Sequence, residues 1–291
     1  MSALAFSRRT VRAAAAAVAV ATTAMIGLAT PAPEATAVPN GNVLYFGDSF
    51  TANPDGVKSA IRGFVPEVFE DYPSRNGCLQ APDNAPRQLD GMTPRPVTDY
   101  SCNAETSRST LHRIEQAIQA GDLHPGTSNV VLAAGLNNYN PFELRNEHNV
   151  LNPPAVREGY LADTRRAAER IRQVAPGARI ILAGSLSIAD PNTTVWCAIN
   201  VVPNLPAGIP LPVLRDAENW HRGNQIEAAR QVGATYVEVK DGSAGNNTCA
   251  PDQQRYVAGV IDTTTPHYNM TAHPSRAGSN FIARQIAGAL Q

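Results

Sequence analysis

The sequence predicts a three-layer α/β/α domain around a five-stranded parallel β-sheet, and two observations lead to this fold class. Five short apolar runs alternate with helix-like stretches, which is the pattern of successive βα units. The runs are almost continuously apolar, as expected of parallel strands that are covered by helices on both faces. The expected strands span residues 43–46, 97–102, 129–134, 179–183 and 235–239.

The helix-like stretches are bounded by residues that begin or end helices. They span residues 107–120, 154–174, 216–232 and 276–290. Prolines open the second stretch, and Gly121 and Gly233 follow the first and the third, where helices commonly end. The last stretch carries Phe281, Ile282 and Ile286 at helical spacing, so it presents an apolar face.

Two stretches follow neither periodicity and are expected to be long loops. Residues 72–97 are rich in Pro, Asn and Gly, and residues 185–213 carry five prolines and few charges. Long ordered loops in a compact domain are often functional, so both are of interest for a binding site.

The first 37 residues are expected to be an export signal. Three arginines within the first 12 residues precede an apolar run over residues 13–28, and small residues follow at 35–37. The apolar run is short and rich in alanine, so we expect no stable membrane span after cleavage. This predicts a secreted or cell-envelope protein with one domain over residues 38–291. Residues 7–12 also resemble a twin-arginine signal, so the Sec and twin-arginine routes both stay open.

The charge balance excludes a nucleic-acid partner. The chain has 24 basic and 25 acidic residues, a formal net charge of −1, and no basic cluster outside the export signal. A surface that follows phosphates needs such a cluster.

Four cysteines in an exported chain are expected to oxidise. Three connectivities are possible, and we favour Cys78 with Cys102 and Cys197 with Cys249, because each pair closes a loop with little regular structure. A zinc site is the alternative. The sequence has no Cys-x-x-Cys and no His-Glu-x-x-His, and its six histidines are scattered.

Ser49 is the candidate nucleophile. Gly47-Asp48-Ser49 follows the first expected strand directly, which places Ser49 at the carboxyl end of a parallel strand, where α/β sheets bind ligands. The alternative is that Asp48 and Ser49 only cap the next helix. A serine hydroxyl is protonated at neutral pH and needs a base within hydrogen-bond reach.

His273 is the best-placed base, because it lies in a turn directly before the last helix. His267, six residues upstream in the same loop, is its rival. The other four histidines, His112, His124, His148 and His221, are expected to be surface residues.

The oxyanion that forms during attack on an ester requires preorganised donors. Gly135-Leu136-Asn137-Asn138 ends the third strand at the same edge of the sheet as Ser49, so the Asn137 amide is a candidate donor. The alternative is that Gly135 and Asn137 are only turn residues.

These blocks together resemble the SGNH (GDSL-like) hydrolase superfamily over essentially the whole mature chain. Gly47-Asp48-Ser49-Phe50 resembles its nucleophile block, Gly135-Leu136-Asn137-Asn138 its Gly-x-Asn-Asp block, and His273-Pro274-Ser275 its histidine block. The resemblance implies a flavodoxin-like three-layer fold and a carboxylic ester hydrolase. The chain is similar above all to the secreted actinobacterial GDSL lipases and esterases, and the two cysteine pairings agree with that similarity.

In those lipases a Cys- and Gly-containing block follows the second strand, and here residues 99–104 stand in its place. The family's glycine falls near Ala104, whose backbone N–H is the implied second oxyanion donor. Alanine keeps this N–H but restricts φ. Asn138 replaces the family's aspartate in the third block.

The family's aspartate three residues before the histidine is also replaced, by Met270. A main-chain oxygen near Asn269 or Met270 is therefore expected to orient His273, which makes a Ser–His dyad. A distant carboxylate, Asp190 or Asp262, is the alternative.

The expected activity is hydrolysis of a lipid or O-acyl ester through an acyl-enzyme on Ser49. Ser49 N–H, Ala104 N–H and Asn137 would bind the oxyanion, and the reaction needs no metal or organic cofactor. We expect a monomer acting on a small-molecule or lipid ester, or on an acylated envelope glycan. The alternatives are an envelope acyltransferase and a non-catalytic envelope-binding module on an inactivated scaffold.

Apolar residues of the 185–213 stretch either line the acyl site or cover an apolar edge of the sheet. They are Val195, Trp196, Ile199, Val201, Val202, Leu205, Ile209 and Leu211.

Overall fold

A five-stranded parallel sheet forms the centre of the computed structural model, which describes residues 41–61, 71–140 and 150–290. In spatial order its strands are β4 (Val97–Asp99), β1 (Val43–Phe46), β5 (Asn129–Leu132), β6 (Arg179–Ala183) and β9 (Thr235–Val237). Every neighbouring pair is parallel. The predicted fold class is confirmed, and the strand order is that of flavodoxin-like folds. The expected export signal lies outside the described residues.

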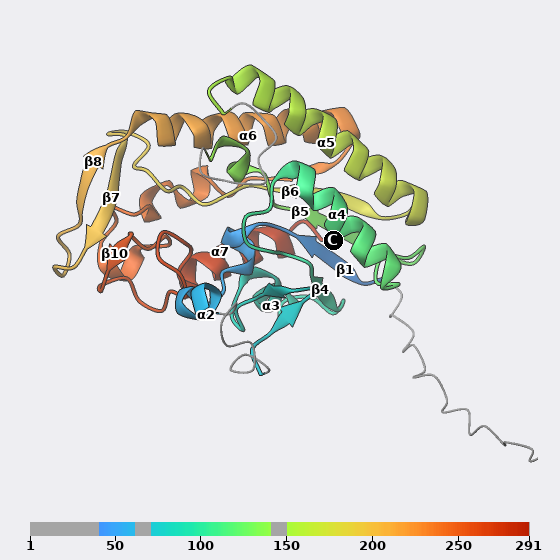
Figure 1. The fold of residues 1–291 in the computed structure, drawn as a ribbon, viewed down its shortest axis with the longest axis horizontal. Helices are drawn as coiled ribbons and strands as arrows, with labels where there is room; N and C mark the ends of the chain where they lie inside the picture. The colour runs from blue at the N-terminus through green and yellow to red at the C-terminus, as the bar shows by residue number, and fades with distance from the viewer. Residues whose placement is uncertain (1–40, 62–70, 141–149, 291) are drawn as a thin grey trace, which may run out of the picture. The chain divides into compact units, whose positions relative to one another are not determined.

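Helices cover both faces of the sheet, because alternate side chains of each strand point to opposite sides. The helices that pack on the sheet are α3 (Ala85–Asp90), α4 (Ser107–Gln119), α5 (Pro153–Val174), α6 (Pro212–Val232) and α7 (Arg276–Ala287). Leu44 and Phe46 of β1 belong to the core cluster that contains α4, α5 and α6. Val43 and Tyr45 belong to the cluster that contains α3 and α7. Figure 1 shows these two groups of helices on either side of the sheet.

The smaller elements lie in the connections. They are α1 (Ser49–Ala52), α2 (Gly56–Ile61), β2 (Ser74–Arg75), β3 (Cys78–Leu79), β7 (Val195–Asn200), β8 (Ala207–Pro210), β10 (Ile261–Asp262) and the 3₁₀ helices η2 (Leu136–Tyr139), η3 (Asp241–Asn246) and η4 (Asp252–Gln254). Both stretches predicted as long loops therefore contain short regular elements. The second forms a β7–β8 hairpin, and Pro210 is tolerated in β8 because β8 is an edge strand.

Several elements end at other residues than predicted. The parallel register ends at the Tyr45–Asp99 pair in β4 and at the Phe46–Leu132 pair in β5, and single backbone hydrogen bonds follow, such as the one from the Cys102 N–H to the Gly47 carbonyl. Similarly, β9 ends at Val237, opposite the last residue of β6. Helix α6 instead begins early, at residue 212, because proline suits the first turn of a helix. Helix α7 ends at residue 287 rather than 290.

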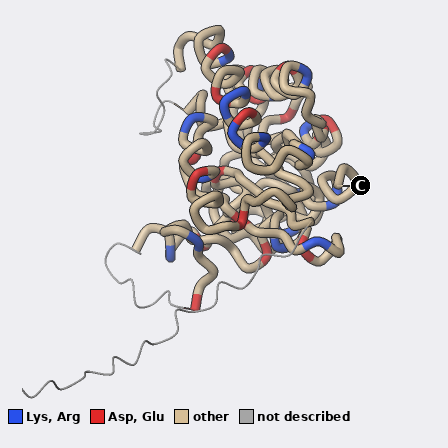
Figure 2. Tube along the Cα trace, turned by 90° about the vertical axis from the view of Figure 1, so that its right-hand side faces the viewer, with Lys and Arg blue, Asp and Glu red and all other residues tan. Residues whose placement is uncertain are grey.

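Charged residues are interspersed rather than grouped by sign along the described helices (Figure 2). Arg222, for example, bonds to both Glu238 and Asp241, and Arg230 bonds to Glu227. Within the described residues, no helix is both long enough and apolar enough to span a bilayer.

Two disulfides join separate segments of the chain, in the pairing favoured from the sequence. Cys78–Cys102 joins β3 to the segment after β4, with Cα atoms 5.1 Å apart, and Cys197–Cys249 joins β7 to the segment after η3, with Cα atoms 5.0 Å apart. They close loops of 24 and 52 residues. A disulfide stabilises mainly by restricting the unfolded chain, and more so for a longer loop.

Removing the longer loop's disulfide is expected to be the more damaging change. Replacing Cys197 and Cys249 by serine should lower the free energy of unfolding by about 4 kcal/mol, and replacing Cys78 and Cys102 by about 3 kcal/mol. Urea denaturation of the two double variants measures both losses. A clearly larger loss for the Cys78 and Cys102 variant would contradict loop entropy as the dominant effect.

Candidate active site

The site lies at the point in the sheet where successive strands are added on opposite sides. β1 and β5 are neighbours, but the chain leaves β1 toward β4 on one side and leaves β5 toward β6 on the other. Such a switch point opens a crevice at the carboxyl ends of the strands. Ser49 follows β1 and Gly135 follows β5, so both reach this crevice.

Ser49 is the first residue of α1. The Asp48 carboxylate caps this helix by accepting a hydrogen bond from the Phe50 N–H at 3.0 Å. Glycine is required at position 47, because a Cβ there would lie 2.2 Å from the Thr51 hydroxyl oxygen. The Gly-Asp-Ser turn therefore does cap a helix, and it also brings Ser49 to the wall of a cavity.

This active-site cavity has a volume of about 350 Å³ and is lined by four separate segments of the chain. Its described lining residues are Asp48, Ser49, Phe50, Asn103, Ala104, Leu136, Asn137, Asn140, Met270 and His273. The structure thus brings together all four residues expected to act in catalysis. None of the described lining residues comes from the 185–213 stretch, so the idea that this stretch lines the acyl site is not supported.

The backbone carbonyl of Thr271 holds the His273 ring. Nδ1 lies 2.8 Å from this oxygen. A carbonyl can only accept a hydrogen bond, so Nδ1 carries the proton and Nε2 is left as the acceptor. Nε2 has no hydrogen-bond partner among the described protein groups. A main-chain oxygen was expected, but its residue is Thr271 and not Asn269 or Met270.

Neither of the alternative carboxylates orients His273 in the structure, because both are engaged elsewhere. Asp190 accepts hydrogen bonds from the backbone of Asn192 and Thr193. Asp262 accepts from the Gly259 N–H and the Thr265 hydroxyl.

Burial lowers the pKa of His273, and the hydrogen bond to Thr271 opposes part of this effect. A general base must be neutral to accept a proton, so activity is lost as the pH falls through this pKa. We expect kcat/KM to be constant from about pH 7 to 8 and to fall with a midpoint below the ordinary histidine value of about 6.5.

Asp48 needs a control in this pH experiment. It lines the same cavity, and burial raises its pKa to about 7 although the Phe50 and Gly135 N–H groups lower it. The Asp48→Asn variant removes this ionisation and keeps an N-cap. Its acid limb should persist below pH 6.5, and a midpoint above 6.5 in this variant would contradict the assignment to His273.

Ala104 stands where the family has a glycine, and its backbone conformation is one that favours glycine. It has a φ of +63°, the left-handed region that glycine adopts without strain. A hydrogen-bond network holds the preceding loop: Asp99 accepts from Ser101 N–H at 2.8 Å and from the Asn84 side chain at 2.6 Å. The alanine is therefore held in a left-handed conformation, at a cost in backbone strain.

Replacing Ala104 by glycine should relieve this strain. The left-handed conformation costs a non-glycine residue about 1–2 kcal/mol, which glycine's greater freedom in the unfolded chain partly offsets. We expect the free energy of unfolding to rise by about 0.5–1 kcal/mol, measured by urea denaturation. Ester hydrolysis should stay within about twofold of wild type, since the N–H is retained. A loss of stability would show that Ala104 is unstrained.

Asn137 and Asn138 have different tasks on η2. Asn137 lines the cavity, and its amide donates to the Glu105 carbonyl at 3.0 Å, which fixes its orientation. Asn138 is fully buried. Its side-chain oxygen accepts a hydrogen bond from the Ser107 N–H, and its amide group donates one to the Ser107 hydroxyl. The Ser107 hydroxyl in turn donates to Asp163. An aspartate at 138 has no N–H to give to Ser107.

Three groups that position His273 could not be recognised from the sequence. The buried Asn53 side chain donates to the Pro274 carbonyl at 2.8 Å, which joins the end of α1 to the histidine segment. The Ala258 N–H donates to the His273 carbonyl at 2.9 Å. The Ser275 hydroxyl donates to the carbonyl of Arg255, itself a fully buried arginine. These contacts join distant segments, and no local pattern marks them.

The other histidines do not line the described part of the cavity. His267 and His112 are exposed, His124 is half-buried, and His148 lies outside the described residues. The prediction of a surface position is wrong for His221, which is only 2 % exposed. It lies on the buried face of α6, next to Gly135.

Comparisons with known proteins agree with the geometry. The sequence model of the GDSL-like lipase/acylhydrolase family matches residues 45–280. No curated protein sequence matches the chain. Among solved structures, phospholipase A1 from Streptomyces albidoflavus is similar over 86% of this chain and 99% of its own, at 16% identity and a TM-score of 0.57.

Two further solved structures have the same fold. An extracellular lipase from Streptomyces rimosus is similar over 86% of this chain and 100% of its own, at 15% identity and a TM-score of 0.59. An acetylxylan esterase from Geobacillus stearothermophilus is similar over 86% of this chain and 95% of its own, at 14% identity and a TM-score of 0.53.

Proposed function

Because the chain belongs to the GDSL-like lipase/acylhydrolase family, we propose that it is a secreted serine esterase that acts through an acyl-enzyme on Ser49. One observation carries the proposal. Ser49, His273, Ala104 and Asn137 come from four distant segments and line a single cavity. This set supplies a nucleophile, a base and oxyanion donors, which are the groups that acyl transfer requires.

The proposed reaction has two steps. The Ser49 hydroxyl oxygen attacks the ester carbonyl while His273 Nε2 accepts its proton, and His273 then gives that proton to the departing alcohol. In the second step water attacks the acyl-enzyme while His273 accepts its proton. His273 then gives this proton to the Ser49 oxygen as the bond to the acyl group breaks and the acid leaves. The Ser49 and Ala104 N–H groups and the Asn137 amide stabilise the negative oxygen of each tetrahedral intermediate.

The cavity favours a small ester. Its volume of about 350 Å³ lies near the lower end of the range for small-molecule sites, about 300–1,000 Å³. Phe50, Leu136 and Met270 give it apolar walls. We propose a short acyl group, attached to a lipid or glycan alcohol that extends out of the cavity. Lipids and acetylated xylan are the substrates that the titles of the similar structures name.

Two features support export and action outside the cytosol. Both disulfides need an oxidising compartment to persist. The first 37 residues have the composition of an export signal. We propose that the mature enzyme starts at Val38 and acts as a monomer.

Hydrolysis of p-nitrophenyl esters by purified residues 38–291 tests the proposal. The rate should be highest for acetate to butyrate and should fall for longer chains. A fluorophosphonate probe should label one residue, and mass spectrometry should find it on the peptide that contains Ser49. The absence of both hydrolysis and labelling would overturn the proposal. A rate that rises up to C16 esters would overturn only the short acyl group.

A further inference from the structure

Helix α6 packs directly against the loop that carries the proposed oxyanion donor. We call residues 135–139 the oxyanion loop, because it contains Asn137. A Cβ at Gly135 would lie 2.5 Å from the Tyr160 ring and 2.8 Å from His221 Cε1, so only glycine fits here and its backbone rests against both rings. The rings of Tyr160 and His221 pack edge to face, with centroids 5.7 Å apart.

A second residue of α6 holds the other end of this loop. The Asn224 amide, one helical turn after His221, donates to the Tyr139 hydroxyl at 2.7 Å. Asn224 is 3 % exposed and therefore rigidly placed. The Gln225 amide ties the same face of α6 to β6 through the Ala183 carbonyl at 2.7 Å. The helix is thus fixed to the sheet and contacts the oxyanion loop at both ends.

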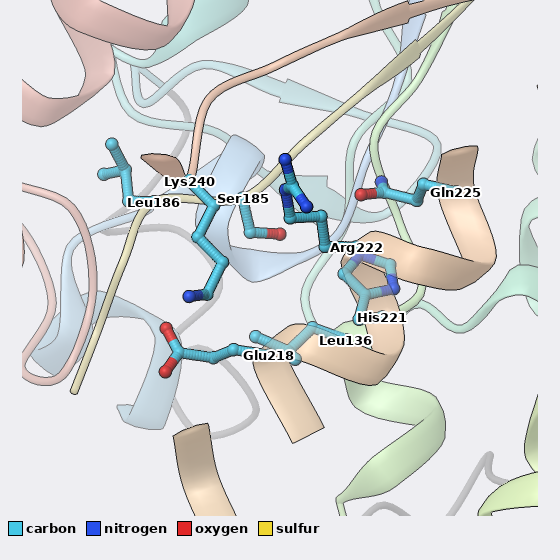
Figure 3. A pocket seen from close by; sticks show the side chains of 8 residues that line it. All are labelled: Leu136, Ser185, Leu186, Glu218, His221, Arg222, Gln225 and Lys240. Atoms are coloured by element: carbon cyan, nitrogen blue, oxygen red, sulfur yellow. The ribbon is translucent and has the colours of Figure 1, made fainter. Parts of the chain in front are cut away.

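Two buried polar side chains, His221 and Gln225, lie on this face of α6. Neither of its ring nitrogens has a hydrogen-bond partner among the described protein groups, and the same is true of Gln225 Oε1. His221 and Gln225 line a small cavity of about 10 Å³ together with Leu136 of the oxyanion loop (Figure 3). This volume accommodates about one water molecule, and such a site normally supplies two to four polar partners.

Other polar side chains also line this small cavity. Figure 3 shows the Lys240 ammonium group pointing toward the Glu218 carboxylate, and both residues line the cavity. Burial lowers the pKa of His221 to about 3, so the ring is neutral at physiological pH. A neutral imidazole has one donor and one acceptor nitrogen and can bond to a bridging water.

We propose that His221 and Asn224 are positioning residues that hold the oxyanion loop from beneath, with one buried water bonded to His221. This inference rests on the proposed esterase function and assigns it two residues that do not touch the substrate. His221 supports the loop at Gly135, and Asn224 fixes it through Tyr139. A misplacement of about 1 Å in a catalytic group can cost roughly a hundredfold in rate.

The test compares two substitutions of His221. His221→Ala removes the ring beneath Gly135 and should lower kcat about 10- to 100-fold with KM within about threefold. His221→Gln keeps a donor and an acceptor and should recover most of this loss. Both rates are divided by the number of sites that a fluorophosphonate titrates, so a partly unfolded sample does not lower them.

Affinity for a boronic acid provides a second measurement. The boronate adduct on Ser49 mimics the tetrahedral anion, so its binding should weaken in parallel with kcat in His221→Ala. The milder Tyr139→Phe variant removes only the hydroxyl that Asn224 holds and should lower kcat about 3- to 10-fold. Ile226→Ala, on the exposed side of α6, is the matched control and should be unchanged.

The possible outcomes separate this inference from the proposed function. If His221→Ala keeps kcat per titrated site within twofold of wild type, or changes only KM, the positioning role is overturned while the esterase function stands. If the wild type neither hydrolyses esters nor is labelled at Ser49, the proposed function itself fails.

Discussion

Replacing Ser49 by alanine is expected to lower kcat for a p-nitrophenyl ester about 10⁴- to 10⁶-fold and to leave the fold intact. In the proposed reaction the hydroxyl oxygen forms the bond to the acyl group, and no other side chain among the described lining residues of the cavity is a substitute nucleophile at neutral pH. The side chain is partly exposed on the cavity wall, so its loss creates no void in the core. Steady-state kinetics and a thermal unfolding curve measure the two effects.

Ser59→Ala is the matched control for this variant. Ser59 lies in α2 and is not among the described lining residues of the active-site cavity. Its hydrolysis rate should equal that of wild type. If Ser49→Ala retains more than about 1% of the wild-type rate, a different nucleophile, or none, must carry the activity.

Replacing His273 by alanine should be almost as damaging as replacing Ser49, because the two groups act as a unit. Without the imidazole, the Ser49 hydroxyl keeps its proton and is a weak nucleophile. The Ser49→Ala/His273→Ala double variant should therefore be no slower than Ser49→Ala alone. Kinetics of the two single variants and the double variant measure this non-additivity.

His267→Ala is the control for the base. His267 lies six residues upstream in the same segment, but it is exposed and is not among the described residues of the cavity. We expect its rate to match wild type. Additive losses in the double variant would contradict a Ser–His pair, and a large loss in His267→Ala would point to the rival histidine.

The fold class and its main elements could be predicted because the spacing of apolar residues within one segment indicates which faces of that segment are buried. Strands β1 and β6 have the predicted bounds, since a continuous apolar run marks a strand with two covered faces. The bounds of β4 and β5 could not be predicted, because they depend on the register that each strand forms with β1 in the assembled sheet. The β7–β8 hairpin was missed because its prolines are typical of loops.

The short sequence motifs that form the candidate site could be predicted, but the contacts between them could not. Ser49, Ala104, Asn137 and His273 stand in short blocks that resemble a family, and they lie around one cavity. The orienting group of His273 could be predicted only as a main-chain oxygen. The carbonyl of Thr271 is chosen by the conformation of the loop, which sequence patterns do not report.

The sequence by itself determined the α/β/α fold class and indicated the candidate reactive groups, because local apolar periodicity predicts the first and short motifs predict the second. The tertiary structure decided which groups meet and what holds them. Asn53 and Pro274 are separated by 221 residues in sequence and are joined by one hydrogen bond. The buried His221 lies against Gly135, although the sequence of its helix is rich in charged residues. Such contacts depend on how whole elements pack, so no single segment of the chain encodes them.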